Sequence, residues 1–286
     1  MNLKRTFVLG ALACAGMSQA WDLNGHRIVA QIAWDTMKPA TREWITSLLK
    51  DFQPDGATDY TTMTGAATLA DDYKHHPKDS PLKVHHTWSN MHFIDYMLAS
   101  SPKLELKPNQ KENDTVIFAI NEAVNALQGE KSTFAEQGKP WCLAMLIHFI
   151  GDIHQPMHCI DDSDSGGNGF TLQYNSSIKN LHALWDDVAT EKYKLRRKHT
   201  PDQIEAAAKD IEALVPADSV GDLGFGPVGW ATESFKLGVT NGYGGATKDG
   251  TQTDDYLAKW QEIGIRRMAT AGYRLRDLLE KLTPKN

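Results

Sequence analysis

A mostly apolar segment in the middle of the chain, residues 141–153, constrains the fold most strongly, because it contains ionisable side chains. His148 and Asp152 are four residues apart, so a helix places them on one face, one turn from each other. Pro156 should stop that helix, which allows the chain to turn His158 back toward the same place. Buried ionisable groups need partners, so the segment predicts a cluster of polar side chains inside the protein.

Similar pairs occur elsewhere in the chain. His182 and Asp186 are again four residues apart, and His92 and Asp95 are three apart. Each pair alone would more often be a surface feature or an ordinary hydrogen bond, and one buried histidine would favour a satisfied core residue. Their number indicates metal binding instead, since imidazole nitrogen mixed with carboxylate oxygen suits borderline metals such as zinc.

Hydrophobic periodicity is helical along most of the chain, and few stretches alternate with period two. We expect helices around 28–33 after a turn at Asn24-Gly25, from Pro39, after a cap at Asp114, from Pro140 to residue 153, over 204–214 and over 256–282. Polar loops cover 101–113, 161–180 and the glycine-rich 221–250, and residues 170–174 could form a short strand. The sequence therefore predicts an all-α, single-domain fold with long functional loops.

Residues 1–20 are typical of a secretory signal peptide. Lys4 and Arg5 precede a short apolar run, and small residues at 18 and 20 suit a signal peptidase. Cleavage would leave 266 of the 286 residues, starting at Trp21, and would take the net charge from −6 to −8. No later stretch is apolar enough to cross a membrane, so we expect a secreted or periplasmic, soluble, monomeric product.

Charge and cysteine content add weaker constraints. The acidic balance argues against tight binding of nucleic acid through phosphate contacts alone, but it allows an enzyme that holds nucleic acid briefly. After cleavage Cys142 and Cys159 remain. They could form a disulfide in an oxidising compartment, and two free thiols are equally consistent with the sequence.

A set of motifs follows one order along the chain. They are Trp21…Gly25-His26, Leu69-Ala-Asp71, Met91-His92-Phe-Ile-Asp95, His148-Phe-Ile-Gly-Asp152, Gln155-Pro-Met-His158, Gly166-Gly-Asn168, Asn180-Leu-His182…Trp185-Asp186 and Trp230-Ala-Thr-Glu-Ser234. Together they resemble the type I single-strand-preferring nucleases, which are secreted trinuclear-zinc enzymes related in fold to zinc-dependent phospholipase C. The resemblance implies an orthogonal, almost wholly α-helical nuclease domain over residues 21–286.

The resemblance also implies three sets of zinc ligands. The first ion would be held by His148, Asp152, Asp71 and His92, and the second by His158, His182 and Asp186. The third would be held by His26, a bridging Asp152, and the free amine and carbonyl of Trp21. A terminal amine and its own carbonyl can close a five-membered chelate, which only a freed N-terminus offers.

Hydrolysis of phosphodiesters follows from the resemblance. A close zinc pair can bind the phosphate, lower the pKa of a water and stabilise the leaving oxygen. The expected substrates are single-stranded DNA, RNA and nucleotides, with 5′-phosphate products and 3′-nucleotidase activity. Asp152 would be the catalytic bridge, and Lys74, one helical turn from Asp71, would neutralise developing charge. The family usually has Arg at that position, so the bidentate fork is absent.

Three residues are expected to contact the substrate. Phe93 could stack on a base and Asp95 could accept hydrogen bonds from its edge, while Asn168 could contact base or backbone. Phe93 could equally belong to the core, and Lys74 could be an ordinary surface lysine. Two further differences from the family are Asp22, where Gly is usual, and His154, where Thr is common.

Two other functions remain consistent with these residues. Zinc-dependent phospholipase C shares the metal-binding framework, although it often has Glu at the position of Asp186 and should have a more apolar entrance. A non-catalytic zinc-binding protein would use the same ligands without turnover.

Overall fold

The computed structural model describes residues 21–285 except 55, 57, 58, 76–85, 196–199, 222, 223 and 225, and only the backbone at 74, 75, 86 and 87. The expected signal peptide, residues 1–20, lies outside the described residues. Within the described part, the regular structure is helical, and extended segments meet only in isolated β-bridges. The predicted all-α fold class is confirmed.

The α-helices are α1 (Leu23–Thr36), α2 (Pro39–Leu49), α3 (Met63–Ala66), α4 (Leu69–His75), α5 (Val116–Gln128), α6 (Lys139–Asp152), α7 (Leu181–Asp186), α8 (Val188–Tyr193), α9 (Pro201–Leu214), α10 (Gly226–Leu237) and α11 (Asp254–Leu282). The 3₁₀ segments are η1 (His86–His92), η2 (Leu98–Ser100), η3 (Ala135–Gln137), η4 (Pro156–Cys159) and η5 (Ala217–Ser219), and η6 (Gly238–Tyr243) is a π-helical turn.

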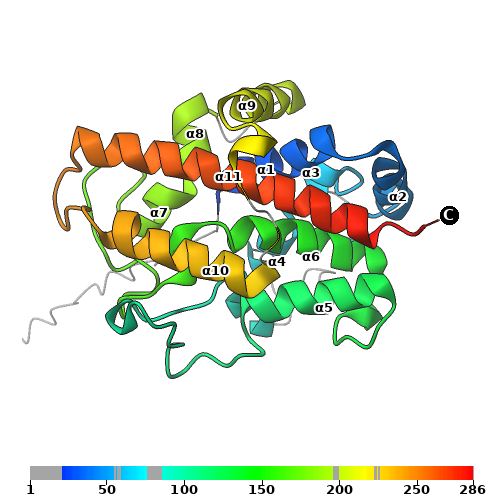
Figure 1. Ribbon diagram of the computed structural model, residues 1–286, viewed down its shortest axis with the longest axis horizontal. Helices are drawn as coiled ribbons and strands as arrows, with labels where there is room; N and C mark the ends of the chain where they lie inside the picture. Colours follow the sequence, from blue (N-terminus) through cyan, green and yellow to red (C-terminus); the bar gives the residue numbers. More distant parts are fainter. Residues whose placement is uncertain are drawn as a thin grey trace, which may run out of the picture.

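Helix α6 is the centre of the molecule. Figure 1 shows it between α11 and α5, and it also contacts α1, α3 and α4. Every residue from 141 to 152 is buried, as expected for a helix that is apolar on all sides. His148 and Asp152 are therefore placed in the protein interior by the helix that carries them.

Close approach of α1 to α11 closes the fold over α6. A Cβ atom at Gly272 of α11 would lie 2.6 Å from Cγ2 of Ile32 and 3.1 Å from the carbonyl oxygen of Val29. Only glycine permits this separation, because real Cβ contacts are longer. The contact holds α1, which carries His26, against the rest of the domain.

Several predictions of local structure were wrong. The segment 221–250 contains α10 and η6, so it is not a continuous loop. Trp230, Ala231 and Phe235 of α10 are buried, and the helix packs on η4. This tertiary packing outweighs the low helix propensity of the glycines that favoured a loop. Residues 170–174 form only single bridges, and no strand is present there.

Helix boundaries also differ from those predicted. Asp22 caps α1 by accepting a hydrogen bond from the N–H of Gly25, so the expected turn lies inside the helix. Thr115, not Asp114, caps α5. Helix α6 agrees within one residue at each end with the helix expected from Pro140 to residue 153, and Pro156 begins η4. The expected loops over 101–113 and 161–180 are confirmed as irregular segments apart from single bridges.

The two cysteines are free thiols. Cys142 and Cys159 are both buried, and their Sγ atoms lie 3.4 Å and 3.5 Å from the carbonyl oxygens of Phe134 and Ile153. Of the two alternatives left by the sequence, the disulfide is wrong.

None of the helices within the described residues is long and apolar enough to cross a membrane.

The crossing of α1 and α11 predicts an effect on stability. Gly272→Ala should lower the free energy of unfolding by about 1–3 kcal/mol, because the added methyl group overlaps Ile32. Unfolding in urea, with the midpoint and slope compared between the two proteins, measures this. Ala258→Leu, which adds volume on the exposed face of the same helix, is the control and should change stability little. Equal stability of Gly272→Ala and the unsubstituted protein would contradict the close approach.

Candidate metal centre

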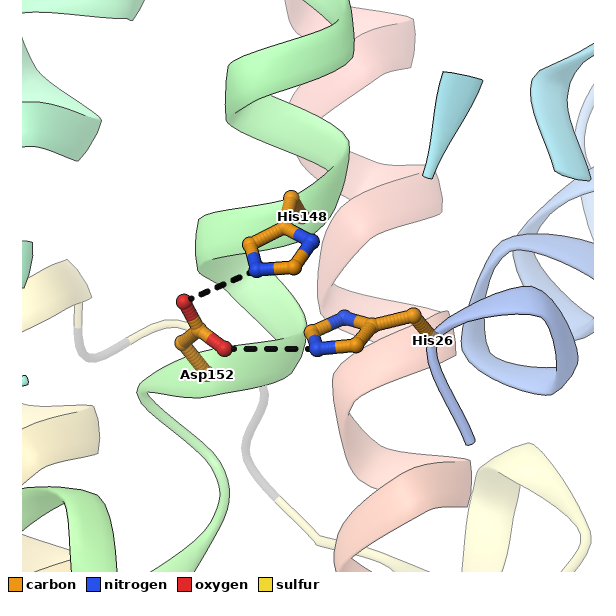
Figure 2. Close-up of side chains that lie close together, drawn as sticks. All are labelled: His26, His148 and Asp152. Carbon is orange, nitrogen blue, oxygen red and sulfur yellow. Dashed lines mark ion pairs between the residues drawn. The ribbon is translucent and has the colours of Figure 1, made fainter. Parts of the chain in front are cut away.

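A buried cluster forms where α6 faces α1. His148 and Asp152 lie one turn apart on α6, and His26 reaches them from α1 (Figure 2). His26 Nε2 is 3.4 Å from Asp152 Oδ1, and His148 Nε2 is 3.3 Å from Asp152 Oδ2. Asp152 thus presents one carboxylate oxygen to each imidazole. A side chain at Gly151 would collide with the ring of His26, so glycine is required for this approach.

Two further residues close the other side of the cluster. His92 Nδ1, at the end of η1, lies 3.0 Å from Asp152 Oδ2 and 3.1 Å from His148 Nε2. Asp71 Oδ1, on α4, lies 3.8 Å from both His92 Nδ1 and His148 Nε2. Ligand atoms of Asp71, His92 and His148 all lie within 4.8 Å of one another, as do those of His26, His148 and Asp152. The cluster therefore offers two adjacent places for a metal ion.

Hydrogen bonds to the backbone fix which nitrogen of His148 faces the cluster. Its Nδ1 lies 2.7 Å from the carbonyl oxygen of Ala67, which can only accept, so Nδ1 carries the proton. In the neutral ring Nε2 then presents a lone pair to a carboxylate oxygen of Asp152. Two electron pairs facing each other repel unless a cation lies between them, and a histidine anchored through its other nitrogen is typical of metal ligands.

Charge in the cluster leads to the same conclusion. Burial would raise the pKa of Asp152, but His148 and His92 in their protonated forms lower it well below its usual range, and a metal ion in place of those protons would act in the same direction. An ionised Asp152 is completely buried, and neither of its oxygens accepts a hydrogen bond from the described residues. Buried charges are normally paired or bound to metals, so these residues fit a bound metal ion.

A second cluster lies nearby. His158 on η4 and His182 and Asp186 on α7 offer ligand atoms within 4.8 Å of one another. His158 Nδ1 donates to the carbonyl of His92 and His182 Nδ1 donates to that of Gly166, so both Nε2 atoms carry lone pairs. These atoms face each other at 3.0 Å. A proton or a metal ion between them relieves the repulsion, and with Asp186 the set suits a metal ion.

Trp21 lies beside the first cluster. Its indole Nε1 donates to the carbonyl oxygen of Gly151 at 2.9 Å, and the residue is fully buried. Its neighbour Asp22 caps α1 and donates its backbone N–H to the carbonyl of Asp186 at 3.0 Å. The start of α1 is thereby anchored between α6 and α7. Asp22, at the position where the family usually has glycine, uses its carboxylate as the helix cap.

The turn after α6 is held by a buried network that the sequence did not reveal. Arg267 Nε donates to the carbonyl of His154 at 3.0 Å, and Arg274 Nη1 lies 3.0 Å from His154 Nε2. Both arginines bind Glu233, and Ser234 Oγ donates to the carbonyl of Ile153. His154 is therefore a buried hydrogen-bonding residue, and burial beside two arginines keeps its pKa well below the usual range. Only the motif Trp230–Ser234 indicated that α10 takes part.

A cavity of about 540 Å³ opens over the clusters. Its lining includes His92, His158 and His182 together with all three predicted substrate-binding residues, namely Phe93, Asp95 and Asn168. Phe93 is half-buried and lines this cavity, which places it outside the closed core. Lys107 also lines the cavity, and its polar loop carried no signal that could have identified it. The side chain of Lys74 lies outside the described residues.

The α-helical fold and its His/Asp clusters define a metal-binding site next to a substrate-sized cavity. The family model described as S1/P1 Nuclease matches residues 21–284, so the chain belongs to the S1/P1 nuclease family and is a metal-dependent nuclease. The expectation of a hydrolase of this family is confirmed.

Three relatives illustrate this membership. Endonuclease 1 of Arabidopsis thaliana is 27% identical over 96% of this chain and 92% of its own length. Nuclease P1 of Penicillium citrinum is 26% identical over 73% of this chain and 71% of its own. Nuclease S1 of Aspergillus oryzae (strain ATCC 42149 / RIB 40) is 29% identical over 61% of this chain and 56% of its own.

The opposed lone pairs predict that metal removal destabilises the fold. Chelation should lower the unfolding free energy by about 4 kcal/mol for each site at which the free metal concentration had been a thousandfold above the dissociation constant. The measurement is the midpoint of thermal unfolding with and without chelator. The control is chelator already saturated with zinc, which should have no effect. An identical midpoint in both samples would show that the buried clusters do not depend on metal.

Proposed function

We propose that this chain is a zinc-dependent endonuclease that cleaves single-stranded DNA and RNA, leaves 5′-phosphates, and also acts as a 3′-nucleotidase. The observation that carries the proposal is the shared cavity. Ligands of both candidate metal clusters line the same cavity as Phe93, Asp95 and Asn168. A phosphate held at the clusters would place an attached base within reach of an aromatic face, which bases inside a duplex cannot reach without unpairing.

Zinc is the metal that the ligands favour. Each cluster combines imidazole nitrogens with carboxylate oxygens and has no thiolate, which suits zinc among the common borderline metals. When bound, the ions would polarise the phosphate and activate a water for attack. We assign His148, Asp152, Asp71 and His92 to one ion, His158, His182 and Asp186 to the second, and Trp21, His26 and Asp152 to the third.

The protein's own groups would orient the substrate. Asp152 lies between His26 and His148, so its carboxylate can hold two sites at a fixed separation. Phe93 would stack on the base, Asp95 would bind the base edge, and Asn168 would contact base or backbone. Lys74 belongs to α4, as does Asp71, and we propose that its ammonium group neutralises charge on the phosphate.

The amino-terminal sequence supports a proposal about where in or outside the cell the protein acts. We propose that residues 1–20 are a signal peptide whose removal frees Trp21, and that the monomeric product acts in a periplasmic or extracellular space. The side chain of Trp21 is buried against α6, close to His26, which would bring its backbone amine and carbonyl near the cluster.

Phospholipase C is the second candidate, and one observation favours testing it. The cavity wall includes the aromatic side chains of Tyr73, Trp88, Phe134 and Trp141, which would also suit an acyl chain.

Substrate assays test the proposed function. The zinc-loaded protein should cut single-stranded DNA faster than duplex of the same sequence and should leave phosphatidylcholine intact. Phe93→Ala and Phe93→Leu should both weaken substrate binding, since stacking on an aromatic face is worth about 1–3 kcal/mol per base. Leu keeps most of the apolar volume but has no aromatic face, so Phe93→Leu separates a loss of base stacking from a loss of packing. Unchanged apparent affinity in Phe93→Leu would return Phe93 to a packing role, and hydrolysis of lipid alone would favour phospholipase C.

Metal content tests the role of Trp21. Protein beginning at Trp21 should bind three zinc ions, whereas protein with one extra N-terminal Met should bind two and be nearly inactive. The free amine has an ordinary pKa of roughly 7.7–8.0, so a metal can displace its proton, but an amide nitrogen is a poor ligand. A Met added after Asn286 is the control and should leave three ions. Three ions and full activity in the N-terminally extended protein would remove Trp21 from the site.

A further inference from the structure

Two charged side chains, Asp95 and Lys107, line the cavity beside Phe93, and the buried side chain of Asp161 lies next to them. Asp95, Lys107 and Asp161 lie on three extended segments, which are joined by the β-bridges Tyr96↔Leu106 and Met97↔Asp161. The backbone N–H of Lys107 donates to the carbonyl of Asp95 at 2.8 Å. The backbone therefore brings the three side chains together, although they are far apart in the sequence.

The ammonium group of Lys107 is shared unequally between the two carboxylates. Its Nζ is 2.7 Å from Asp161 Oδ2 but 3.7 Å from Asp95 Oδ2. Asp161 Oδ1 also accepts hydrogen bonds from the N–H groups of Gly166 and Asp164. Burial opposes ionisation of Asp161, but these contacts outweigh it and lower its pKa. Asp161 is thus a fixed negative charge that takes most of the compensation Lys107 provides.

Asp95 is left with a charge that depends on pH near neutrality. Its side chain is 14% exposed, and burial together with the nearby charge of Asp161 raises its pKa to about 6. Lys107 opposes this rise and Asp164 adds to it. Above about pH 6 Asp95 is a carboxylate, and below it the neutral acid dominates.

The two forms of Asp95 suit different bases. A carboxylate offers only acceptors, whereas the neutral acid offers one donor and one acceptor. The Watson–Crick edge of guanine presents two neighbouring donors, N1–H and the 2-amino group, which match a carboxylate. Adenine presents the 6-amino donor beside the N1 acceptor, and cytosine presents a similar pair, so both match the neutral acid. Adenine or cytosine against the carboxylate places two acceptors face to face, and guanine against the neutral acid places two donors face to face.

We propose that Lys107 and Asp161 determine the base preference of this nuclease by setting the charge on Asp95. Guanine is preferred when Asp95 is ionised, and adenine or cytosine is preferred when Asp95 is neutral. Lys107 and Asp161 are positioning residues in this scheme, because they act through Asp95. The inference rests on the proposed function, in which the cavity holds a base of a single strand.

The experiment compares two symmetrical dinucleoside monophosphates, GpG and ApA, with the zinc-loaded protein between pH 5 and pH 7.5. Because both nucleotides of each substrate carry the same base, the base in the cavity is known whichever nucleotide binds there. The readout is the ratio of kcat/KM for GpG to kcat/KM for ApA, in which effects of pH on the metal centre cancel. The ratio should rise on the order of tenfold as pH increases through the Asp95 transition, since a charged hydrogen bond is gained or lost.

Substitutions locate the effect. In Asp95→Asn the amide offers a donor and an acceptor at every pH, so the ratio should stay at its low-pH value throughout. Lys107→Met should shift the transition to higher pH, because the opposing cation is gone. Lys107→Arg keeps the charge and should keep the original profile. Lys103→Met, at an exposed position of the same loop, is the matched control and should also leave the profile unchanged.

Each outcome decides the inference. A ratio that does not change with pH in the unsubstituted protein, or a pH-dependent ratio in Asp95→Asn, overturns it. So does a Lys107→Met profile that coincides with that of Lys103→Met. If Lys107→Met fails to fold, the Asp95→Asn ratio still decides. Cleavage of neither dinucleotide and of no single-stranded polymer would overturn the proposed function instead, which separates the two failures.

Discussion

The buried carboxylate of Asp152 is the constraint on which the rest of the structure depends. It lies at the end of the central helix, completely buried, with the nitrogens of three histidines around it. A carboxylate in such a position is costly unless a cation compensates it. The elements that supply those nitrogens and Asp71 are α1, α4, η1 and α6, which are well separated in the sequence, so the metal site and the tertiary fold stabilise each other.

Backbone carbonyls prepare the histidines for this role. Ala67, His92 and Gly166 each accept a hydrogen bond from the Nδ1 of one histidine, which turns the Nε2 lone pair toward a cluster. The carbonyls of Ala67 and Gly166 belong to turns, and that of His92 belongs to the last residue of η1. The irregular segments of the chain therefore fix the protonation state of the ligands, while α6 and α7 fix their positions.

The sequence predicted local features of the site better than distant ones. The pairs His148/Asp152 and His182/Asp186 follow from helical spacing, so both could be recognised without any structure. His26, Asp71 and His92 come from other elements, and only the resemblance to a family connected them. Glycine content misled the prediction over 221–250, where packing of Trp230 and Phe235 stabilises a helix.

Features set by long-range contact had no signal in the sequence. Lys107 belongs to a loop without periodicity, and its position depends on a single bridge to the segment after His92. The pairing of Glu233 with Arg267 and Arg274 joins α10 to α11, and no spacing in the sequence indicates that these two helices meet. The disulfide alternative likewise required knowledge of where two cysteines lie in space.

The charge of the molecule explains why a site of this kind must recognise its substrate locally. The whole chain carries a formal net charge of −6, so its overall field repels a polyanion. Attraction of a phosphate must then come from cations concentrated at the His/Asp clusters. Contacts to many backbone phosphates would be weak on such a surface, which leaves the cavity around Phe93 and Asp95 as the place where affinity for a particular nucleotide can be generated. In the proposed function, selection by an exposed base, instead of by the length of the phosphate backbone, distinguishes a single strand from a duplex.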